Sequence, residues 1–293
     1  MAGTSAPTRT KADLLERLTT LCAVGDVSVD VVEAALVLSA LRRLDIDLDP
    51  YRTHVATLNS EVGARVQHGG TPPDALREVL INAFGYSGDR ETYDDLQNAD
   101  LATVIDRRRG LPVALSLLWL HAARAQGWAC VGVAFPGHFL VLLDADGTRT
   151  VLDPFNNGAA LEPPDLRRLL KTVYGADAEL RPQHIATMSD RDVLLRLENN
   201  IKVRQLRSGD AAGASTTLER MTAIAPDRPE LWFEAGALNA QIDAVGAACR
   251  AFDRFLAVDA ENPPSEDVEV SAARAKARRD ATALLRELRR RLN

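Results

Sequence analysis

The sequence has few of the features that mark metal sites, disulfide-linked domains or cofactor enzymes. Its three cysteines, Cys22, Cys130 and Cys249, are widely spaced and form no CxxC pair. An odd number at such spacing argues against a disulfide framework or a zinc site, and free thiols suit a reducing compartment. No metal-binding pattern such as HExxH is present, and no glycine-rich phosphate loop follows a predicted strand. We therefore expect neither a metal nor another cofactor.

Long apolar runs and an excess of basic charge are also missing. The N-terminus lacks the apolar core of a secretory signal peptide, and no stretch reaches the roughly 18 apolar residues of a membrane-spanning helix. The formal net charge of −6 gives no reason to expect nucleic-acid binding. We therefore predict that the protein is cytoplasmic and binds neither a membrane nor a nucleic acid. Lysine occurs at only four positions, so arginine carries most of the basic charge, which is typical of a GC-rich bacterial genome.

The first 126 residues are dominated by helical patterns. Residues 1–10 are small, polar and proline-containing, which predicts a disordered terminus. Apolar residues then recur at the three- and four-residue spacing of helices. The predicted helices cover 30–44, 51–66, 71–85, 101–109 and 113–125. The last of these is apolar on nearly all sides, which is typical of a helix buried at the centre of a domain.

The pattern changes to short strands after residue 127. Residues 128–135, 138–143 and 150–153 are predicted strands, separated by the turns Pro136-Gly137 and Asp144 to Gly147. Two of these strands form a hairpin, so a helical block surrounds a small antiparallel sheet. This predicts an α+β fold for a region that spans residues 11–188.

The C-terminal region, residues 189–293, is helical and contains a repeat. The segment Ile224 to Pro229 resembles Val258 to Pro263, which begins 34 residues later. A 34-residue helix-turn-helix period that ends near a proline is typical of tetratricopeptide repeats. We therefore predict an all-α repeat region, which begins with Ser189 as an N-cap and ends in a basic helix.

Two residues of the hairpin are candidates for a functional pair. His138 begins one predicted strand, and Asp153 ends the next, fifteen positions later. Such a histidine can be a base oriented by the carboxylate. It can equally be a buried structural group whose ring is satisfied by Asp153, since an unpaired one would cost about 1–3 kcal/mol. The sequence leaves both interpretations open.

The segments around these residues resemble a known family. They read RRGLPVALS (108–116), FPGHFL (135–140) and LDPFNNG (152–158), preceded by NAFGYSG (82–88). Over roughly residues 28–262 the chain resembles the SirB-type branch of the transglutaminase-like superfamily, in which tetratricopeptide-like helices follow a transglutaminase-like core. This resemblance implies a fold related to papain-like cysteine proteases.

The resemblance also implies roles for particular residues. In active members a cysteine heads a buried helix, a histidine begins the next strand and an aspartate follows on the neighbouring strand. His138 and Asp153 take the histidine and aspartate positions, and Gly110-Leu111-Pro112 takes the place of Gly-x-Cys. Pro112 therefore occupies the nucleophile position and is not catalytic, since it has no nucleophilic atom.

No other residue is an obvious substitute nucleophile. Ser116 lies one turn further along the buried helix, and Cys130 lies on the strand before His138. Both are expected to be small core residues, and Cys22 and Cys249 are expected to be structural. One of the three arginines at 107–109 is expected to pair with an acid of the core.

Three functions are compatible with this pattern. The first is a non-catalytic scaffold or regulator whose repeat helices bind a protein or peptide partner. The second is an amide-bond hydrolase or acyl-transferase in which His138, oriented by Asp153, activates water or an unusual nucleophile. The third is a reader of a small ligand or modified peptide, with the same two residues as polar anchors in a cleft.

Overall fold

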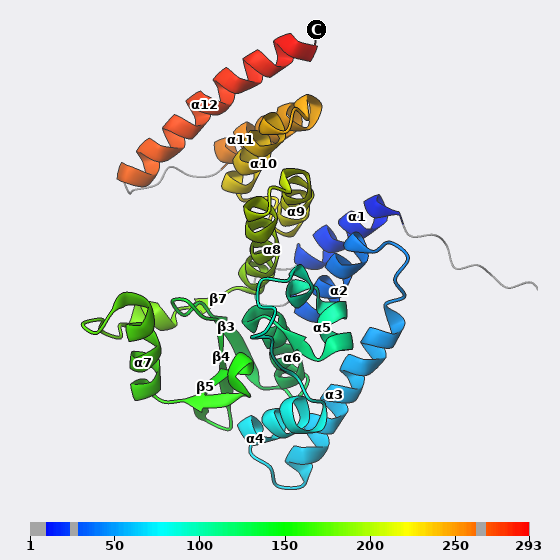
Figure 1. Ribbon diagram of the computed structural model, residues 1–293, viewed down its shortest axis with the longest axis vertical. Helices are drawn as coiled ribbons and strands as arrows, with labels where there is room; N and C mark the ends of the chain where they lie inside the picture. Colours follow the sequence, from blue (N-terminus) through cyan, green and yellow to red (C-terminus); the bar gives the residue numbers. More distant parts are fainter. Residues whose placement is uncertain (1–9, 24–28, 262–267, 293) are drawn as a thin grey trace, which may run out of the picture. The chain divides into compact units, whose positions relative to one another are not determined.

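The structure is a computed structural model that describes residues 10–23, 29–261 and 268–292 (Figure 1). The predicted disordered segment, residues 1–10, lies outside these ranges except for Thr10. Contacts divide the chain into two units, residues 1–197 and 198–293, and the division falls within helix α8 (Asp190–Arg207). We describe each unit by itself.

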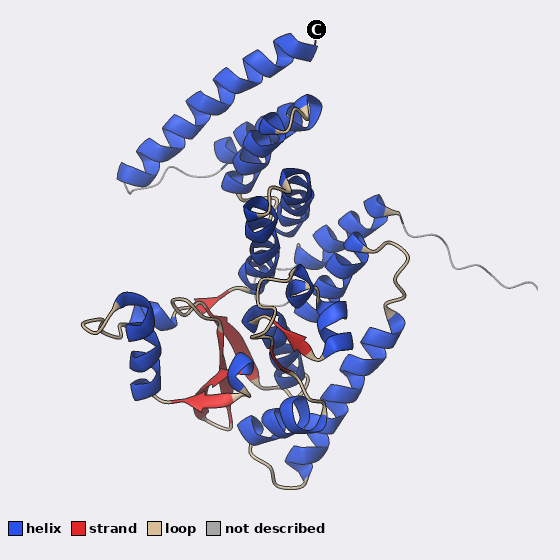
Figure 2. Ribbon diagram, viewed as in Figure 1, coloured by secondary structure: helices blue, strands red, loops and turns tan. Residues whose placement is uncertain are grey.

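The first unit is a set of helices around a five-stranded sheet, as the α+β prediction requires (Figure 2). Its helices are α1 (Lys11–Cys22), α2 (Val31–Arg42), α3 (Asp49–Gln67), α4 (Pro72–Arg77), α5 (Leu101–Arg107), α6 (Pro112–Arg124) and α7 (Pro163–Tyr174). A π-helical segment, η1 (Glu78–Ala83), directly follows α4. The helix predicted over 71–85 is therefore present through Ala83, with a π-helical second half that was not predicted, and Thr71 caps α4 as expected.

The sheet is larger than the sequence suggested. Its strands lie in the order β6-β5-β4-β3-β7, and every neighbouring pair is antiparallel. Their bounds are β3 (Ala129–Val133), β4 (Leu140–Ala145), β5 (Thr148–Asp153), β6 (Ala159–Leu161) and β7 (Thr187–Met188). The three predicted strands correspond to β3, β4 and β5, whereas the two short edge strands and α7 were not predicted.

Helix α6 is the centre of the first unit. It packs against α2, α3 and α5 on one side and against β3, β4 and the turn η3 (Pro154–Asn156) on the other. From Pro112 to Leu120 every side chain is buried, as the apolar sequence predicts. A two-stranded parallel pair, β1 (Ser87–Gly88) and β2 (Arg109–Gly110), leads the chain into this helix. Two 3-10 turns, η2 (Leu96–Ala99) and η4 (Pro182–Ile185), complete the unit.

The second unit is wholly helical in the part that the structure describes. After the C-terminal part of α8 it contains α9 (Ala211–Ile224), α10 (Pro229–Gln241), α11 (Val245–Glu261) and α12 (Val268–Leu292). Helices α9 and α11 begin 34 residues apart, and the two copies of the repeated motif start near their C-terminal ends, at Ile224 and Val258. Pro229 begins α10, whereas Pro263 lies outside the described residues. Ser189 accepts the backbone N–H of Asp192 at 3.2 Å, which confirms it as the N-cap of α8.

None of the helices in the described ranges combines the length and the apolar character that crossing a membrane requires.

Candidate functional site

The structure brings His138 and Asp153 together. Nε2 of His138 lies 2.8 Å from Oδ2 of Asp153, which is the last residue of β5. His138 itself does not begin a strand, contrary to the prediction. It closes a turn in which its N–H donates to the carbonyl of Phe135, and Gly137 adopts a φ of +68° that favours glycine. Strand β4 begins two residues later, at Leu140.

Asp153 is buried and is held by several donors. Its Oδ1 accepts the backbone N–H groups of Phe155 and Asn156, each at 3.1 Å, and its Oδ2 accepts the side-chain amide of Asn156 at 2.6 Å. Burial by itself raises the pKa of Asp153, but the hydrogen bonds from His138 and Asn156 outweigh burial and hold that pKa below its usual value. Asp153 is therefore a carboxylate at neutral pH.

This arrangement fixes the tautomer of His138. A carboxylate only accepts hydrogen bonds, so Nε2 of His138 must carry the hydrogen that it shares with Asp153. In the neutral ring Nδ1 is then a free acceptor, and no hydrogen-bond partner for it is found among the described residues. His138 is therefore equipped, in geometry, to take a proton at Nδ1.

The ring of Phe155 packs against His138 and against several other residues near it. His138 and Tyr93 meet it edge-on, with ring centroids 6.1 and 5.9 Å away. The guanidinium of Arg90 lies over it, 5.3 Å from its centroid. On another side Gly88 packs so closely that an added Cβ would lie 2.5 Å from the ring. A glycine is therefore required at position 88 for this packing.

Two arginines lie close to the His138–Asp153 pair. Arg90 donates a hydrogen bond to the side-chain carbonyl of Asn156, and the side-chain Nδ2 of the same residue donates to Asp153. Arg196, from α8, donates to the backbone carbonyl of His138 at 3.1 Å, and burial lowers its pKa. Sequence reasoning missed both arginines and Tyr93, because they lie 58 to 66 positions from the residues that they contact and belong to no motif.

Pro112 is the first residue of α6, where its missing N–H has no cost. The start of α6 is connected to the His138 region through the β1–β2 pair, in which Gly88 lies opposite Gly110. Gly88 contacts Phe155, and α6 packs against η3, which contains Phe155. The three predicted site positions thus belong to one contiguous part of the first unit.

The arginines before α6 have structural partners. Arg107 forms a 2.8 Å ion pair with the buried Asp89, which confirms that one of the three pairs with a core acid. Arg108 adopts a left-handed conformation, with a φ of 58°, and stacks over Tyr86. It also lies 2.6 Å from Nε2 of His54. Burial and this positive charge lower the pKa of His54 to about 4, so His54 is neutral at pH 7.

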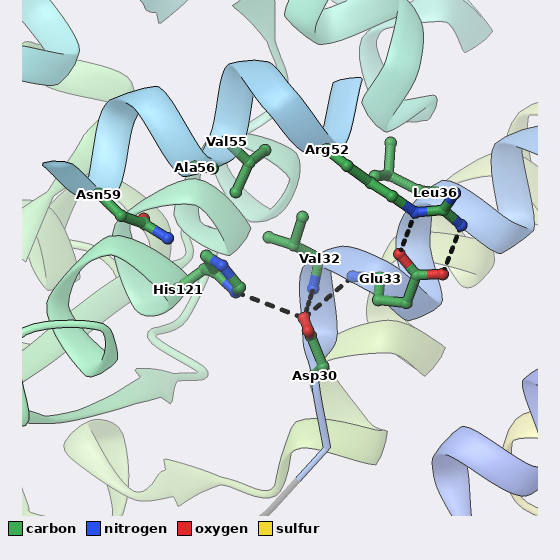
Figure 3. Close-up of a pocket in the computed structure, with 9 residues that line it drawn as sticks. All are labelled: Asp30, Val32, Glu33, Leu36, Arg52, Val55, Ala56, Asn59 and His121. Atoms are coloured by element: carbon green, nitrogen blue, oxygen red, sulfur yellow. Dashed lines mark hydrogen bonds and ion pairs between the residues drawn. The ribbon is translucent and has the colours of Figure 1, made fainter. Parts of the chain in front are cut away.

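A separate small cavity lies between α2, α3 and α6. Figure 3 shows His121 joined to Asp30 at one end and Arg52 joined to Glu33 at the other, with Nδ1 of His121 3.3 Å from Oδ1 of Asp30. The cavity measures 170 Å³ and is otherwise lined by Val32, Leu36, Val55, Ala56 and Asn59. No pattern in the sequence predicted this cavity. Within the described ranges no three His, Cys, Asp or Glu side chains are grouped closely enough to hold a metal ion.

Comparison with known families agrees with this architecture. The sequence profile of the transglutaminase-like superfamily matches residues 49–199, just over half of the chain. The chain belongs to the transglutaminase-like superfamily. A tetratricopeptide-repeat profile matches residues 201–287. The predicted order, a transglutaminase-like core followed by repeats, is confirmed.

Several relatives extend over most of the chain. A UPF0162 protein of Xylella fastidiosa is 28% identical over 249 residues, which cover 83% of this chain and 89% of that protein. A UPF0162 protein of Vibrio cholerae is 27% identical over 84% of this chain and 92% of that protein. The F-box only protein 21 of Mus musculus is 35% identical over 83 residues, 28% of this chain and 13% of that protein. A crystal structure of menin covers 93% of this chain and 75% of its own, with 10% identity and a TM-score of 0.39.

Within the transglutaminase-like core, neither candidate substitute for a cysteine nucleophile is available to a ligand. The hydroxyl of Ser116 is fully buried and donates to the carbonyl of Pro112 at 2.7 Å. Cys130 is 2% exposed, and burial raises the pKa of its thiol to about 12. Cys22 and Cys249 are also buried free thiols. Each of these side chains is packed in the interior of the protein.

Proposed function

We propose that this protein is a non-catalytic member of the transglutaminase-like superfamily that acts as a scaffold or regulator by binding a protein or peptide partner. The observation that carries the proposal is Pro112, which begins α6 at the position where the resemblance expects the cysteine nucleophile. A proline has no group that can attack an amide. The tetratricopeptide-repeat match supports the binding role, because such repeats generally mediate protein–protein interactions.

The core residues near Pro112 support the same proposal. The burial of Ser116 and Cys130 leaves no nucleophilic side chain among the sequence candidates that a substrate could reach. In this proposal the His138–Asp153 pair is structural, since Asp153 satisfies two backbone N–H groups, the Asn156 amide and the imidazole at once. Its retention then has a folding reason that needs no chemistry.

Mass spectrometry with an amide-mimicking electrophilic probe tests this proposal. Wild type, His138→Ala and Cys130→Ala would be incubated with the probe and compared. We expect no labelling that depends on His138. Labelling that disappears in His138→Ala would identify an activated nucleophile and would overturn the proposal.

A second candidate function is amide hydrolysis or acyl transfer, and the geometry of His138 is the observation that favours it. Its Nδ1 has no partner among the described residues, and Asp153 orients the ring from the other side. A water molecule at Nδ1 would meet the requirement of a general base. This candidate predicts turnover of amide substrates that His138→Ala abolishes, and equal rates in the two proteins would exclude it.

A further inference from the structure

Helix α12 has an inner face that packs on the repeat unit. Ala281, Leu285 and Leu288 are buried in a cluster that also contains Phe252 and Phe255 of α11. They are spaced by four and three positions, so they lie on one side of the helix. This packing fixes which side chains of α12 face outward.

The arginines beside this inner face all form ion pairs. They pair with carboxylates of α11 or of the turn before it: Arg274 and Arg278 with Asp259, Arg289 with Asp253, and Arg291 with Asp243. Asp259 is buried, so its two ion pairs anchor α12 to α11. These four arginines therefore have a structural role.

A second set of cations has no such role. Lys276, Arg279, Arg286 and Arg290 are exposed, and none forms an ion pair or hydrogen bond with a described residue. Their spacings of three, seven and four positions align them on one side of α12, opposite the buried residues. We call these four residues the outer basic stripe. They are not needed to hold α12 in place.

The surface between the two central arginines is hollowed. A shallow depression of 300 Å³ is lined by Arg278, Arg279, Thr282, Ala283 and Arg286. Thr282 and Ala283 are small, so another chain can approach the helix backbone between Arg279 and Arg286. Seven residues separate these arginines, which is about 10 Å along the helix axis. Asp280 and Glu287 border the stripe, since Asp280 follows Lys276 by four positions and Glu287 precedes Arg290 by three, but neither acid forms an ion pair with it.

The charge distribution favours a short acidic protein segment over a nucleic acid. Helix α12 carries eight cationic and three acidic side chains, a net +5, within a chain of net charge −6. The rest of the chain is therefore strongly negative and would repel a long polyphosphate. A segment short enough to meet only α12 avoids this repulsion, and arginine pairs readily with carboxylates in bidentate geometry.

We propose that the outer basic stripe of α12 binds an acidic helical segment of a partner protein. Carboxylates at positions i and i+7 of that segment, also about 10 Å apart, pair with Arg279 and Arg286, and small side chains between them lie over Thr282 and Ala283. The inference rests on the proposed protein-binding function and specifies the surface and the chemistry of the partner.

The test uses the full-length protein and a defined probe. A fluorescein-labelled, alanine-based 21-residue helical peptide with glutamates on one face at three-, four- and seven-residue spacing is titrated by fluorescence anisotropy in 150 mM salt. We expect the doubly substituted R279E/R286E protein to bind it at least about tenfold more weakly than wild type. A peptide with lysine in place of glutamate should bind that variant and not wild type.

Matched controls separate the stripe from general charge. Arg250 and Arg254 of α11 are also exposed and have no ion pair with a described residue, so R250E/R254E changes the net charge equally in the same unit. We expect it to bind the peptide within about twofold of wild type. Unchanged circular dichroism and Tm confirm that each variant is folded.

Four results would overturn the proposal. They are equal loss of binding in the control variant, no peptide binding even in 50 mM salt, tighter binding of a 20-base-pair DNA duplex than of the peptide, and a wild-type dimer that R279E/R286E dissociates. The last would assign the stripe to a second copy of this chain. None of these results involves Pro112 or His138, so failure here is distinguishable from failure of the non-catalytic proposal.

Discussion

His138 and Asp153 are joined by a 2.8 Å hydrogen bond in a chain whose helix α6 begins with Pro112. The carboxylate of Asp153 also organises the η3 turn through Phe155 and Asn156. The pair therefore contributes to folding whether or not it takes part in chemistry, and its two roles can be measured separately.

Replacing Asp153 with asparagine should lower the free energy of unfolding by about 1–3 kcal/mol at pH 7, because buried donors lose a charged acceptor. The folded-state pKa of Asp153 is lowered, so its contribution is complete above the unfolded pKa of about 3.9 and is lost as the pH falls through the folded value. Urea titrations of both proteins from pH 3 to 7 should therefore show a difference that shrinks below about pH 4. The exposed Asp177→Asn serves as control, and a difference independent of pH would contradict this account.

Replacing Pro112 with cysteine should create a reactive thiol. The first turn of a helix favours the thiolate, and the free Nδ1 of His138 belongs to the same region. Position 112 is buried, as the three wild-type cysteines are, so a faster rate there reports activation of the thiol and not exposure. We expect Pro112→Cys to be alkylated by iodoacetamide at least about tenfold faster than those cysteines. The rate, followed by intact-protein mass spectrometry, should fall in Pro112→Cys combined with His138→Ala. Equal rates in the single and double variants would show that position 112 is not paired with His138.

His54 should make the protein less stable in mild acid. Its folded-state pKa of about 4 lies below the unfolded value of about 6.5, so the unfolded chain binds the extra proton between these values. Stability from the neutral ring is thus complete above about pH 6.5 and is lost as the pH falls towards 4. Because the ring is only half-buried, we expect the stability lost between these pH values to be about 1–2 kcal/mol. Comparing denaturant unfolding of wild type and His54→Gln at pH 5 and pH 7 measures this, and the same pH dependence in both would exclude His54 as its source.

The buried ion pair of the second unit should respond differently to single and double replacement. Glu198 and Arg220 lie 2.7 Å apart with side chains 0% and 5% exposed. Arg220→Met removes the guanidinium that faces the buried carboxylate of Glu198 and should cost about 3–5 kcal/mol, whereas adding Glu198→Leu should recover most of the loss. Thermal unfolding of the two variants checks this. A double variant as unstable as the single one would mean that the pair is required for the packing of α8 on α9.

The sequence predicted the parts of the fold that are set by local pattern. Helix α6 follows from an apolar segment that begins with proline, and the β4–β5 hairpin follows from alternating residues around Asp144 to Gly147. The pairing of His138 with Asp153 was predicted because both lie at the same end of this hairpin. The repeats were found because their period survives in the sequence.

The features that could not be predicted depend on contacts between residues that are far apart in the sequence. His138 lies in a turn because Gly137 has a positive φ and is followed by a bond to Phe135, neither of which an apolar run reveals. Strands β6 and β7 have three and two residues and exist only through their neighbours in the sheet. Arg90 and Arg196 are distant from His138 in the sequence, and only the folded chain brings them close to it.

The hydrogen bonds of Asp153 also have an evolutionary consequence. A lineage that lost its nucleophile would still need this aspartate to form the turn after β5, so selection for folding would keep half of the old catalytic apparatus without any selection for activity. In such a protein a histidine–aspartate pair can be inherited from an active ancestor, so its presence alone is not evidence of catalysis.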